Sequence, residues 1–260
     1  MIETKIASYG AWKSPISSEL IVGGTIGVSA PKFDGEDIYW LESRPSEKGR
    51  ATLVKLSKNG EQTDAIPAPY NVRTRVHEYG GGAFLINEGT IYFSNYKDQR
   101  VYVTTGGETP RPLTPESSLR YADFRLDSTH NRLICVAEDH SNPDAEAENK
   151  LVSIDLSSGD VTPLVTGASF YTSPYISQTG DKLTWLEWNH PYMPWDSTFL
   201  YVADINEDGS LSNITLVAGS ETESTCQPMF DSQGKLYFSS DRTNWWNFYS
   251  QQSTGFLIML

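Results

Sequence analysis

The sequence has little cysteine and no long apolar segment. Its two cysteines, Cys135 and Cys226, lie in apolar runs typical of strands, which favours buried free thiols over a disulfide framework and indicates a reducing compartment. No segment approaches the roughly 20 apolar residues that a membrane helix requires, and no apolar stretch follows a basic N-terminus. These absences predict a cytoplasmic protein without a membrane partner.

Positive charge is also in short supply. The 20 Lys and Arg residues face 33 Asp and Glu residues, which gives a formal net charge of −13. Because nucleic-acid binding needs a basic face, this composition argues against a nucleic-acid partner. The four histidines show no H-x-x-x-H spacing, and C-x-x-C and GxxxxGK[ST] motifs are missing, so we expect no metal and no other cofactor.

Aromatic residues, glycine and proline are plentiful. Phe, Trp and Tyr make up 12% of the chain, beside 20 Gly and 14 Pro, a mixture that suits short strands joined by tight turns. Helical periodicity is nearly missing after the first two dozen residues, whereas apolar runs bounded by Gly, Asp, Asn and Ser recur throughout. The chain is therefore predicted to be all-β.

A repeat runs along the chain. Four segments align: APKFDGEDIYWLESR from Ala30, YADFRLDSTHNRLICVAED from Tyr121, TSPYISQTGDKLTWLEWN from Thr172 and CQPMFDSQGKLYFSSDR from Cys226. Each reads as a short strand, a polar turn and an apolar strand, and the stretch from Gly81 adds one similar unit. A period of about 40 to 50 residues with four strands per unit predicts a β-propeller of four-stranded antiparallel blades, about five in number with the last partial. A β-sandwich is the alternative.

The predicted boundaries follow from this repeat. Residues 1–27 are a lead-in segment, residues 28–250 form the blades, and residues 251–260 are a divergent apolar tail. The last five residues are apolar and uncharged, which is unusual for a solvated terminus and suggests a truncated or frameshifted end. An open ring of blades would then expose strand edges that invite pairing with another chain.

Several motifs resemble one family. The stretches YGAWKSPI, NVRTRVHEYGGGAF, WLEWNHPYMPWD and SDRTNWWNFY are similar to the N-terminal propeller of the prolyl oligopeptidase (S9) family of serine peptidases, in its bacterial dipeptidyl and acylaminoacyl peptidase-like branch. The resemblance spans residues 8 to 250. It implies a propeller that caps a C-terminal α/β-hydrolase domain and admits only short peptides to a Ser-Asp-His triad.

No catalytic residue follows from this resemblance, because the chain contains no G-x-S-x-G nucleophile elbow. The leading hypothesis is the propeller portion of such a peptidase, inactive alone, with short peptides and the hydrolase domain as partners. Two alternatives stay open. One is a free-standing propeller that acts as a protein-binding scaffold, and the other is a propeller hydrolase or lyase that acts through His77 and carboxylates near the axis.

The segment from Arg73 to Tyr79 is the first candidate substrate-binding or domain-interface site. Arg73 and Arg75 would hold a peptide carboxylate, Glu78 would hold an amine, and His77 and Tyr79 would share a face. If the segment is extended, His77 and Glu78 point to opposite faces. The following three glycines would permit a tight turn and a close backbone approach. The alternative is a buried, hydrogen-bonded strap between blades.

The aromatic stretch from Trp185 to Asp196 is the second candidate. Trp188, His190 and Trp195 would line a pocket, since aromatic side chains offer large contact area at low entropic cost. The alternative is a loop that covers a blade edge. A third stretch, from Asp204, begins like a calcium loop, but Thr215 occupies the twelfth position, which favours a hairpin turn.

Overall fold

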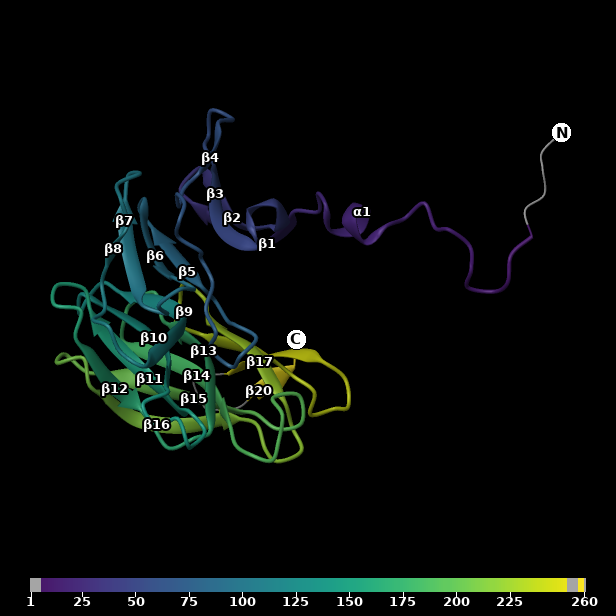
Figure 1. Cartoon of the computed structure of the whole chain (residues 1–260). Coiled ribbons are helices and arrows are strands. Elements are labelled where there is room, and N and C mark those ends of the chain that lie inside the picture. The colour runs from purple at the N-terminus through teal and green to yellow at the C-terminus, as the bar shows by residue number, and fades with distance from the viewer. Residues whose placement is uncertain (1–5, 252–256, 260) are drawn as a thin grey trace. The chain divides into compact units, whose positions relative to one another are not determined.

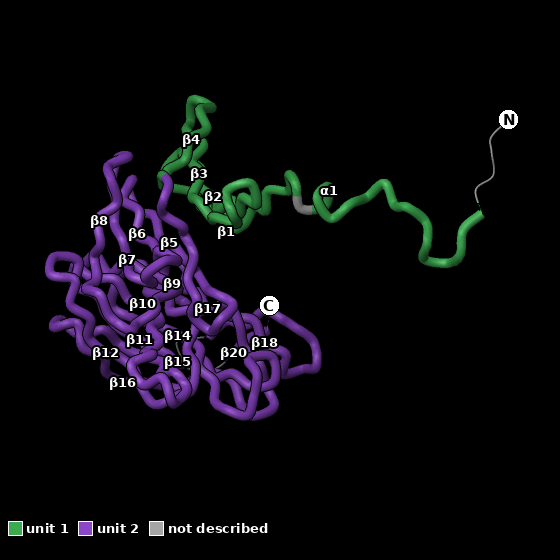
Figure 2. Tube along the Cα trace, in the orientation of Figure 1, with its two compact units in different colours: residues 1–67 green, residues 68–260 purple. Residues whose placement is uncertain are grey.

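The computed structural model describes residues 6–251 and 257–259. In this part of the chain, almost all regular structure is β, arranged as five four-stranded sheets whose strands follow one another in chain order (Figure 1). All strand pairs within the sheets are antiparallel. The predicted all-β class and the four-stranded antiparallel blades are confirmed. The chain divides into two units, residues 1–67 and 68–260 (Figure 2).

The first unit contains a short helix and one sheet. Helix α1 (Ser18–Val22) begins after Ser17, whose side-chain oxygen accepts a hydrogen bond from the Leu20 N–H at 3.2 Å. The sheet consists of β1 (Gly27–Asp34), β2 (Asp37–Arg44), β3 (Arg50–Leu56) and β4 (Gln62–Asp64), with the 3-10 turn η1 (Pro45–Glu47) between β2 and β3. In β3, Leu53 and Val54 are fully buried, so this strand anchors the sheet.

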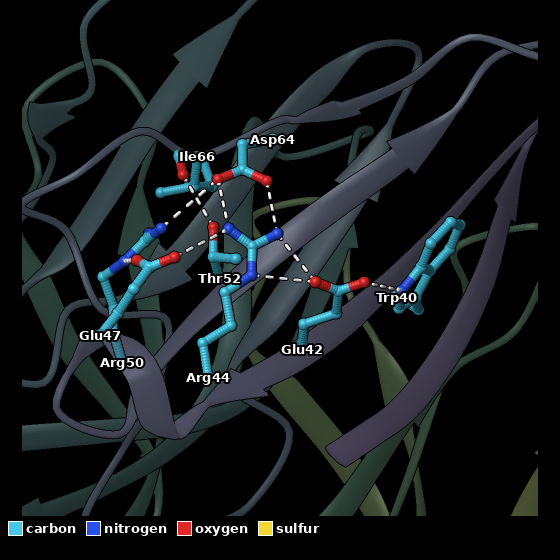
Figure 3. A network of polar contacts seen from close by, with 8 residues as sticks. All are labelled: Trp40, Glu42, Arg44, Glu47, Arg50, Thr52, Asp64 and Ile66. Carbon is cyan, nitrogen blue, oxygen red and sulfur yellow. Dashed lines mark hydrogen bonds and ion pairs between the residues drawn. The ribbon is translucent and has the colours of Figure 1, made fainter. Parts of the chain in front are cut away.

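Five charged side chains join strands β2, β3 and β4 at the η1 end of this sheet (Figure 3). They are Glu42, Arg44, Glu47, Arg50 and Asp64, which we call the arginine network. The Arg44 guanidinium donates to Glu42 at 2.8 and 2.9 Å and to Asp64 at 2.6 and 2.7 Å. Because planar guanidinium and carboxylate groups match in this bidentate way, the network fastens β4 to the rest of the sheet.

The second unit contains four sheets, each a meander of consecutive hairpins. Their strands are β5 (Phe84–Asn87), β6 (Thr90–Ser94), β7 (Val101–Thr105), β8 (Arg111–Pro112); β9 (Leu119–Asp127), β10 (Arg132–Asp139), β11 (Glu148–Asp155), β12 (Val161–Val165); β13 (Phe170–Ile176), β14 (Lys182–Trp188), β15 (Phe199–Ile205), β16 (Leu211–Ala218); and β17 (Thr225–Phe230), β18 (Leu236–Ser240), β19 (Asn247–Gln251), β20 (Leu257–Met259). First strands of consecutive sheets are neighbours: β5 contacts β9, β9 contacts β13, and β13 contacts β17. Blades of a propeller are arranged in this way.

The last blade differs from the prediction in one respect. The sequence predicts a partial blade followed by a divergent tail, but Leu257–Met259 forms β20 and pairs with β19, with Ser250 opposite Ile258. The blade therefore has four strands, because an apolar segment can complete the ladder that β19 leaves open. The other tail residues, 252–256 and 260, lie outside the described residues.

The core of the second unit lies between neighbouring sheets. One cluster joins side chains of the sheets β5–β8 and β9–β12, a second joins β9–β12 to β13–β16, and a third joins β13–β16 to β17–β20. The largest buried side chain, Trp185, belongs to the second cluster. Cys135 is a buried free thiol in the first, whereas Cys226 is half-buried and also free. Neighbouring sheets of the second unit thus bury their facing side chains by stacking on one another.

The first strand of four sheets carries the same irregularity. Ala30, Asp123, Ser173 and Gln227 all have φ between 51° and 60°, and the pairing register shifts beside each of them. Left-handed residues of this kind mark β-bulges, which bend the strand and interrupt the ladder. Three of the four precede a proline, a residue that sheets tolerate at bulges. The repeat therefore extends to the backbone conformation of individual residues.

Candidate functional site

A cavity of about 600 Å³ opens in the second unit. Its walls come from the turn before β5, the β10–β11 connection, the loop before β13 and the β14–β15 loop. Strands β10 and β14 end here, while β11 and β13 begin here, so these loops gather at one end of two neighbouring sheets. Loops positioned in this way by a rigid scaffold commonly carry binding residues. The cavity is the candidate site.

The segment from Val76 to Gly82, which we call the strap, forms one wall. Its first four residues make a turn, with the Gly80 N–H donating to the Val76 carbonyl at 2.9 Å. His77 and Glu78 have φ values of 55° and 62°, a left-handed conformation that is costly for residues other than glycine. Because the segment is a turn, the alternation expected of a strand does not apply, and His77 and Glu78 both line the cavity.

Two carboxylates of the β9–β12 sheet hold the strap in place. The buried Glu138 accepts a hydrogen bond from the His77 N–H at 2.5 Å. Asp123 accepts one from the Gly82 N–H at 2.7 Å, and a Cβ added at Gly82 would lie only 2.8 Å from the Asp123 carboxylate. The glycines therefore serve a tight turn and a close approach, as the sequence predicted.

Aromatic rings form a second part of the wall, next to the strap. Phe170 stacks on Trp188 with ring centroids 5.1 Å apart and an angle of 17° between the ring planes. The rings of His77 and His190 meet this pair edge-on, at 5.5 Å from Trp188 and 5.0 Å from Phe170 respectively. Tyr79 lies beside His77, at 5.8 Å between ring centroids. These arrangements are favourable for aromatic pairs and keep the wall rigid.

The charged side chains of the lining are acidic. Among the described residues that line the cavity, four are glutamates, namely Glu78, Glu138, Glu146 and Glu148, and none is Lys or Arg. Arg120, behind the wall, donates to Glu78 at 2.7 Å and lies 3.9 Å from Glu138. The exposed Glu146 lies 3.0 Å from the His190 ring. Burial lowers the pKa of the His77 imidazole, which keeps this ring neutral at pH 7.

The other predicted site residues lie elsewhere. The guanidinium groups of Arg73 and Arg75 both contact the Tyr96 ring, at 5.0 and 5.4 Å, instead of the cavity. Trp195 is 64% exposed and does not line the cavity, although Trp188 and His190 of the same stretch do. The aromatic stretch is thus divided between core, cavity wall and surface.

Sequence reasoning missed the residues between β10 and β13. Glu138, His140 and the segment from Glu146 to Asn149 line the cavity, and Phe170 supplies its central ring. The signal available was the acidic run AEDHSNPDAEAEN directly after an apolar strand. Acidic loop residues are ordinarily solvated, and only the fold shows that these face aromatic rings.

None of the four histidines in the described residues has a ring nitrogen hydrogen-bonded to a hydroxyl or a thiol. In the described part of the chain, the ring nitrogens of His130, His140 and His190 contact carboxylates or a carbonyl, not a hydroxyl or thiol. The His77 Nε2 atom is buried without a hydrogen-bond partner. No group of three or more His, Cys, Asp or Glu residues is arranged for a metal ion in residues 6–251 and 257–259. None of the helices described is long and apolar enough to cross a membrane.

Three solved structures are similar to this chain over nearly its whole length. A Mycobacterium tuberculosis puromycin-hydrolyzing peptidase is 37% identical, with a TM-score of 0.88, and the match covers 98% of this chain and 42% of that one. A puromycin hydrolase is 34% identical, with a TM-score of 0.89, over 99% of this chain and 42% of the other. A mutant puromycin hydrolase complexed with PGG is 33% identical, with a TM-score of 0.90, over 98% and 42%.

The chain thus spans less than half the length of these three structures. Neither a family model nor a curated protein sequence matches it. Identities above 30% over this many residues nevertheless extend well beyond what a shared architecture alone requires.

Proposed function

The chain belongs to the prolyl oligopeptidase (S9) family of serine peptidases, as the propeller portion of such a peptidase, and from this premise we propose that it selects short peptides for a hydrolase domain. The observation that carries the proposal is 33–37% identity to peptidases over 98–99% of the chain. The missing G-x-S-x-G motif supports a division of labour, in which bond cleavage belongs to a separate α/β-hydrolase domain.

The substrate class is proposed from the relatives and from the cavity. The relatives are named for hydrolysing puromycin, and a cavity of about 600 Å³ has room for a small ligand but not for a folded protein. We propose peptides of a few residues, or aminoacyl amides, as the molecules that the propeller admits. Cytoplasmic location is part of this proposal, supported by the free thiols of Cys135 and Cys226.

The first test reads the coding DNA that follows codon 260 in all three frames. The proposal expects further blade sequence and then a G-x-S-x-G motif in one of them. Unrelated sequence in every frame would instead favour a free-standing scaffold. In a protein assembled through that frame, short peptides should be cleaved whereas casein should not, and deletion of the propeller should remove this discrimination.

The second test uses the chain by itself. Purified 260-residue protein should release no nitroaniline from aminoacyl p-nitroanilides and should leave puromycin intact, at the rate of a buffer blank. Turnover that survives in a His77→Asn variant would point to a contaminating peptidase. Turnover that is lost in this variant would overturn the proposal and favour an autonomous enzyme acting through His77.

A further inference from the structure

Two arginines just before the strap contact the same tyrosine ring. Arg73 is exposed and Arg75 is half-buried, whereas the residues that alternate with them are buried, namely Val72, Thr74 and Val76. Because this alternation is typical of an extended segment, both arginine side chains project from one side of it. Their guanidinium carbons lie 5.0 and 5.4 Å from the centre of the Tyr96 ring. Two permanent positive charges are therefore held on one small patch of the surface.

The connection between β6 and β7 fixes the positions of these groups. The Arg75 N–H donates to the Gln99 side-chain oxygen at 2.8 Å, and the Gln99 amide nitrogen donates to the Tyr96 carbonyl at 2.8 Å. Gln99 is only 4% exposed, so it is a fixed support. The Arg73 N–H donates to the carbonyl of Ser94, the last residue of β6, at 3.1 Å. The ring and both arginines are thus in place before any ligand binds.

Neither guanidinium group has a carboxylate partner. In residues 6–251 and 257–259, the side chains of Arg73 and Arg75 form no ion pair and no hydrogen bond, and the Arg75 Nε atom is buried without an acceptor. Other arginines of the described chain do pair with carboxylates, namely Arg44, Arg50, Arg100, Arg120, Arg132 and Arg242. Since buried donors are nearly always satisfied, the pair calls for an acceptor that the described residues do not supply.

The acidic groups nearby are engaged by other residues. Glu78 pairs with Arg120 at 2.7 Å, and Asp98 accepts a hydrogen bond from the Tyr102 hydroxyl at 2.7 Å. Lys97, next to the ring in the chain, is exposed and adds a third cation without an ion pair among the described residues. The patch is therefore locally positive, although the whole chain carries a formal net charge of −13.

We propose that Arg73 and Arg75, supported by Tyr96, bind an oxyanion, either a carboxylate or a phosphate group. Planar guanidinium groups donate several N–H groups in fixed directions, which matches an anion with two or more oxygens. The ring holds the guanidinium groups by cation–π contact and leaves their charge in place. Free phosphate or the C-terminal carboxylate of a peptide would supply the anion. The site lies outside the cavity, so the inference does not rest on the proposed function.

The test is an NMR titration of the nitrogen-15-labelled full chain at constant pH and ionic strength. The reporter is the Arg75 Nε–H signal, because burial protects this proton from exchange with water, and its loss in Arg75→Lys assigns it. Sodium phosphate or N-acetylglycine should shift the signal to saturation, whereas N-acetylglycinamide, which lacks the carboxylate, should not. A shift with phosphate alone would assign phosphate as the source, and one with N-acetylglycine alone would assign a peptide carboxylate. A shift with both would define a general oxyanion site.

Variants that keep the reporter connect the binding to the pair. Arg73→Gln should weaken oxyanion binding about threefold or more. Arg73→Lys keeps the charge but not the planar fork and should weaken it less. Arg111→Gln removes the same charge from the exposed strand β8 and should leave the affinity unchanged. The backbone amide spectrum verifies that each variant folds, and added sodium chloride should weaken binding to the parent chain.

Three results would overturn the inference. The first is a reporter that shifts with neither anion at millimolar concentration, and the second is an equal shift with N-acetylglycinamide. The third is an affinity that Arg73→Gln leaves unchanged or that Arg111→Gln lowers as much, since either outcome would assign the effect to overall charge. None of these results bears on the proposed function, which depends on the downstream reading frame and on the peptidase assay.

Discussion

The arginine network and the cavity are built from the same residue types but use their charges in opposite ways. In the network, Arg44 and Arg50 contact three carboxylates within one sheet, at distances of 2.5 to 3.4 Å. In the cavity, Arg120 contacts Glu78 and Glu138 and Lys150 contacts Glu148, and none of the lining residues is Lys or Arg. In the network every carboxylate contacts an arginine, whereas in the cavity Glu146 contacts His190 and no Lys or Arg of the described residues.

This difference separates a stabilising role from a binding role. A charge cluster contributes to stability when each member is matched and removing one leaves a buried partner alone. A binding site keeps unmatched groups and accepts some cost in stability for them. By this criterion the network is expected to contribute to stability and the cavity to binding.

The largest expected effect comes from breaking the network. Arg44→Met should lower the free energy of unfolding by roughly 2–4 kcal/mol, because Glu42 is nearly buried and would lose its cation. Urea denaturation followed by tryptophan fluorescence measures this loss. Lys58→Met is the control: its ion pair with Glu36 is exposed on both sides, so the change should stay within about 0.5 kcal/mol. Equal effects of the two substitutions would show that the network stabilises the sheet no more than an exposed ion pair does.

A somewhat smaller loss is expected at Asp123, which ties the strap to two other segments. Its carboxylate accepts hydrogen bonds from the N–H groups of Gly82 and Ser173 and from the Thr172 hydroxyl. Asp123→Ala would leave these donors without their acceptor and should cost about 2–3 kcal/mol. Asp123→Asn keeps one acceptor and a side chain that tolerates φ of 60°, so it should cost less. An alanine variant as stable as the parent would show that the strap is held by other means.

The fold was predictable because its signals are local. Each blade begins with a strand, a polar turn and an apolar strand that lie within about 20 residues, so the repeat appears directly in the sequence. The prolines after Ala30, Ser173 and Gln227 coincide with the bulges and are a further local signal. The fourth strand of the last blade was missed because Leu257–Met259 follows a segment that departs from the repeat.

The site was only partly predictable because its residues come together over long distances in the chain. His77 and Glu138 are 61 positions apart, and no pattern in either segment indicates their hydrogen bond. The alternation argument failed because His77 and Glu78 lie in a turn, and Glu78 is not a residue type that commonly adopts a left-handed conformation. Within the aromatic stretch, composition could not separate the buried Trp188 from the exposed Trp195.

A smaller effect is expected at Arg120, and it is a gain in binding affinity instead of a loss of stability. If the cavity takes an aminoacyl amide, as the proposed function holds, Arg120→Met should raise the affinity for phenylalaninamide, the simplest aromatic compound of that class, by about two- to fivefold. The reason is that Glu78 and Glu138 lose a charge that competes with the ammonium group of the amide. Arg111→Met, a substitution on the exposed strand β8, should leave the affinity unchanged. Calorimetric titration measures both. Weaker binding in a correctly folded Arg120 variant would mean that these carboxylates serve structure alone.

The smallest effect is the dependence of stability on pH. The arginine network and the cavity wall should lose stability in different pH ranges. Hydrogen bonds from Arg44 lower the pKa of the Asp64 carboxyl, so the folded state binds fewer protons than the unfolded chain, and this contribution is lost only as the pH falls below about 4. Burial lowers the pKa of His77, so protonation favours the unfolded chain and stability falls once the pH drops below about 6.5. Urea midpoints measured between pH 7 and 5 should therefore depend less on pH in His77→Asn, whereas Arg44→Met should keep the parent slope there. If His77→Asn keeps that slope as well, the cavity wall does not hold His77 neutral.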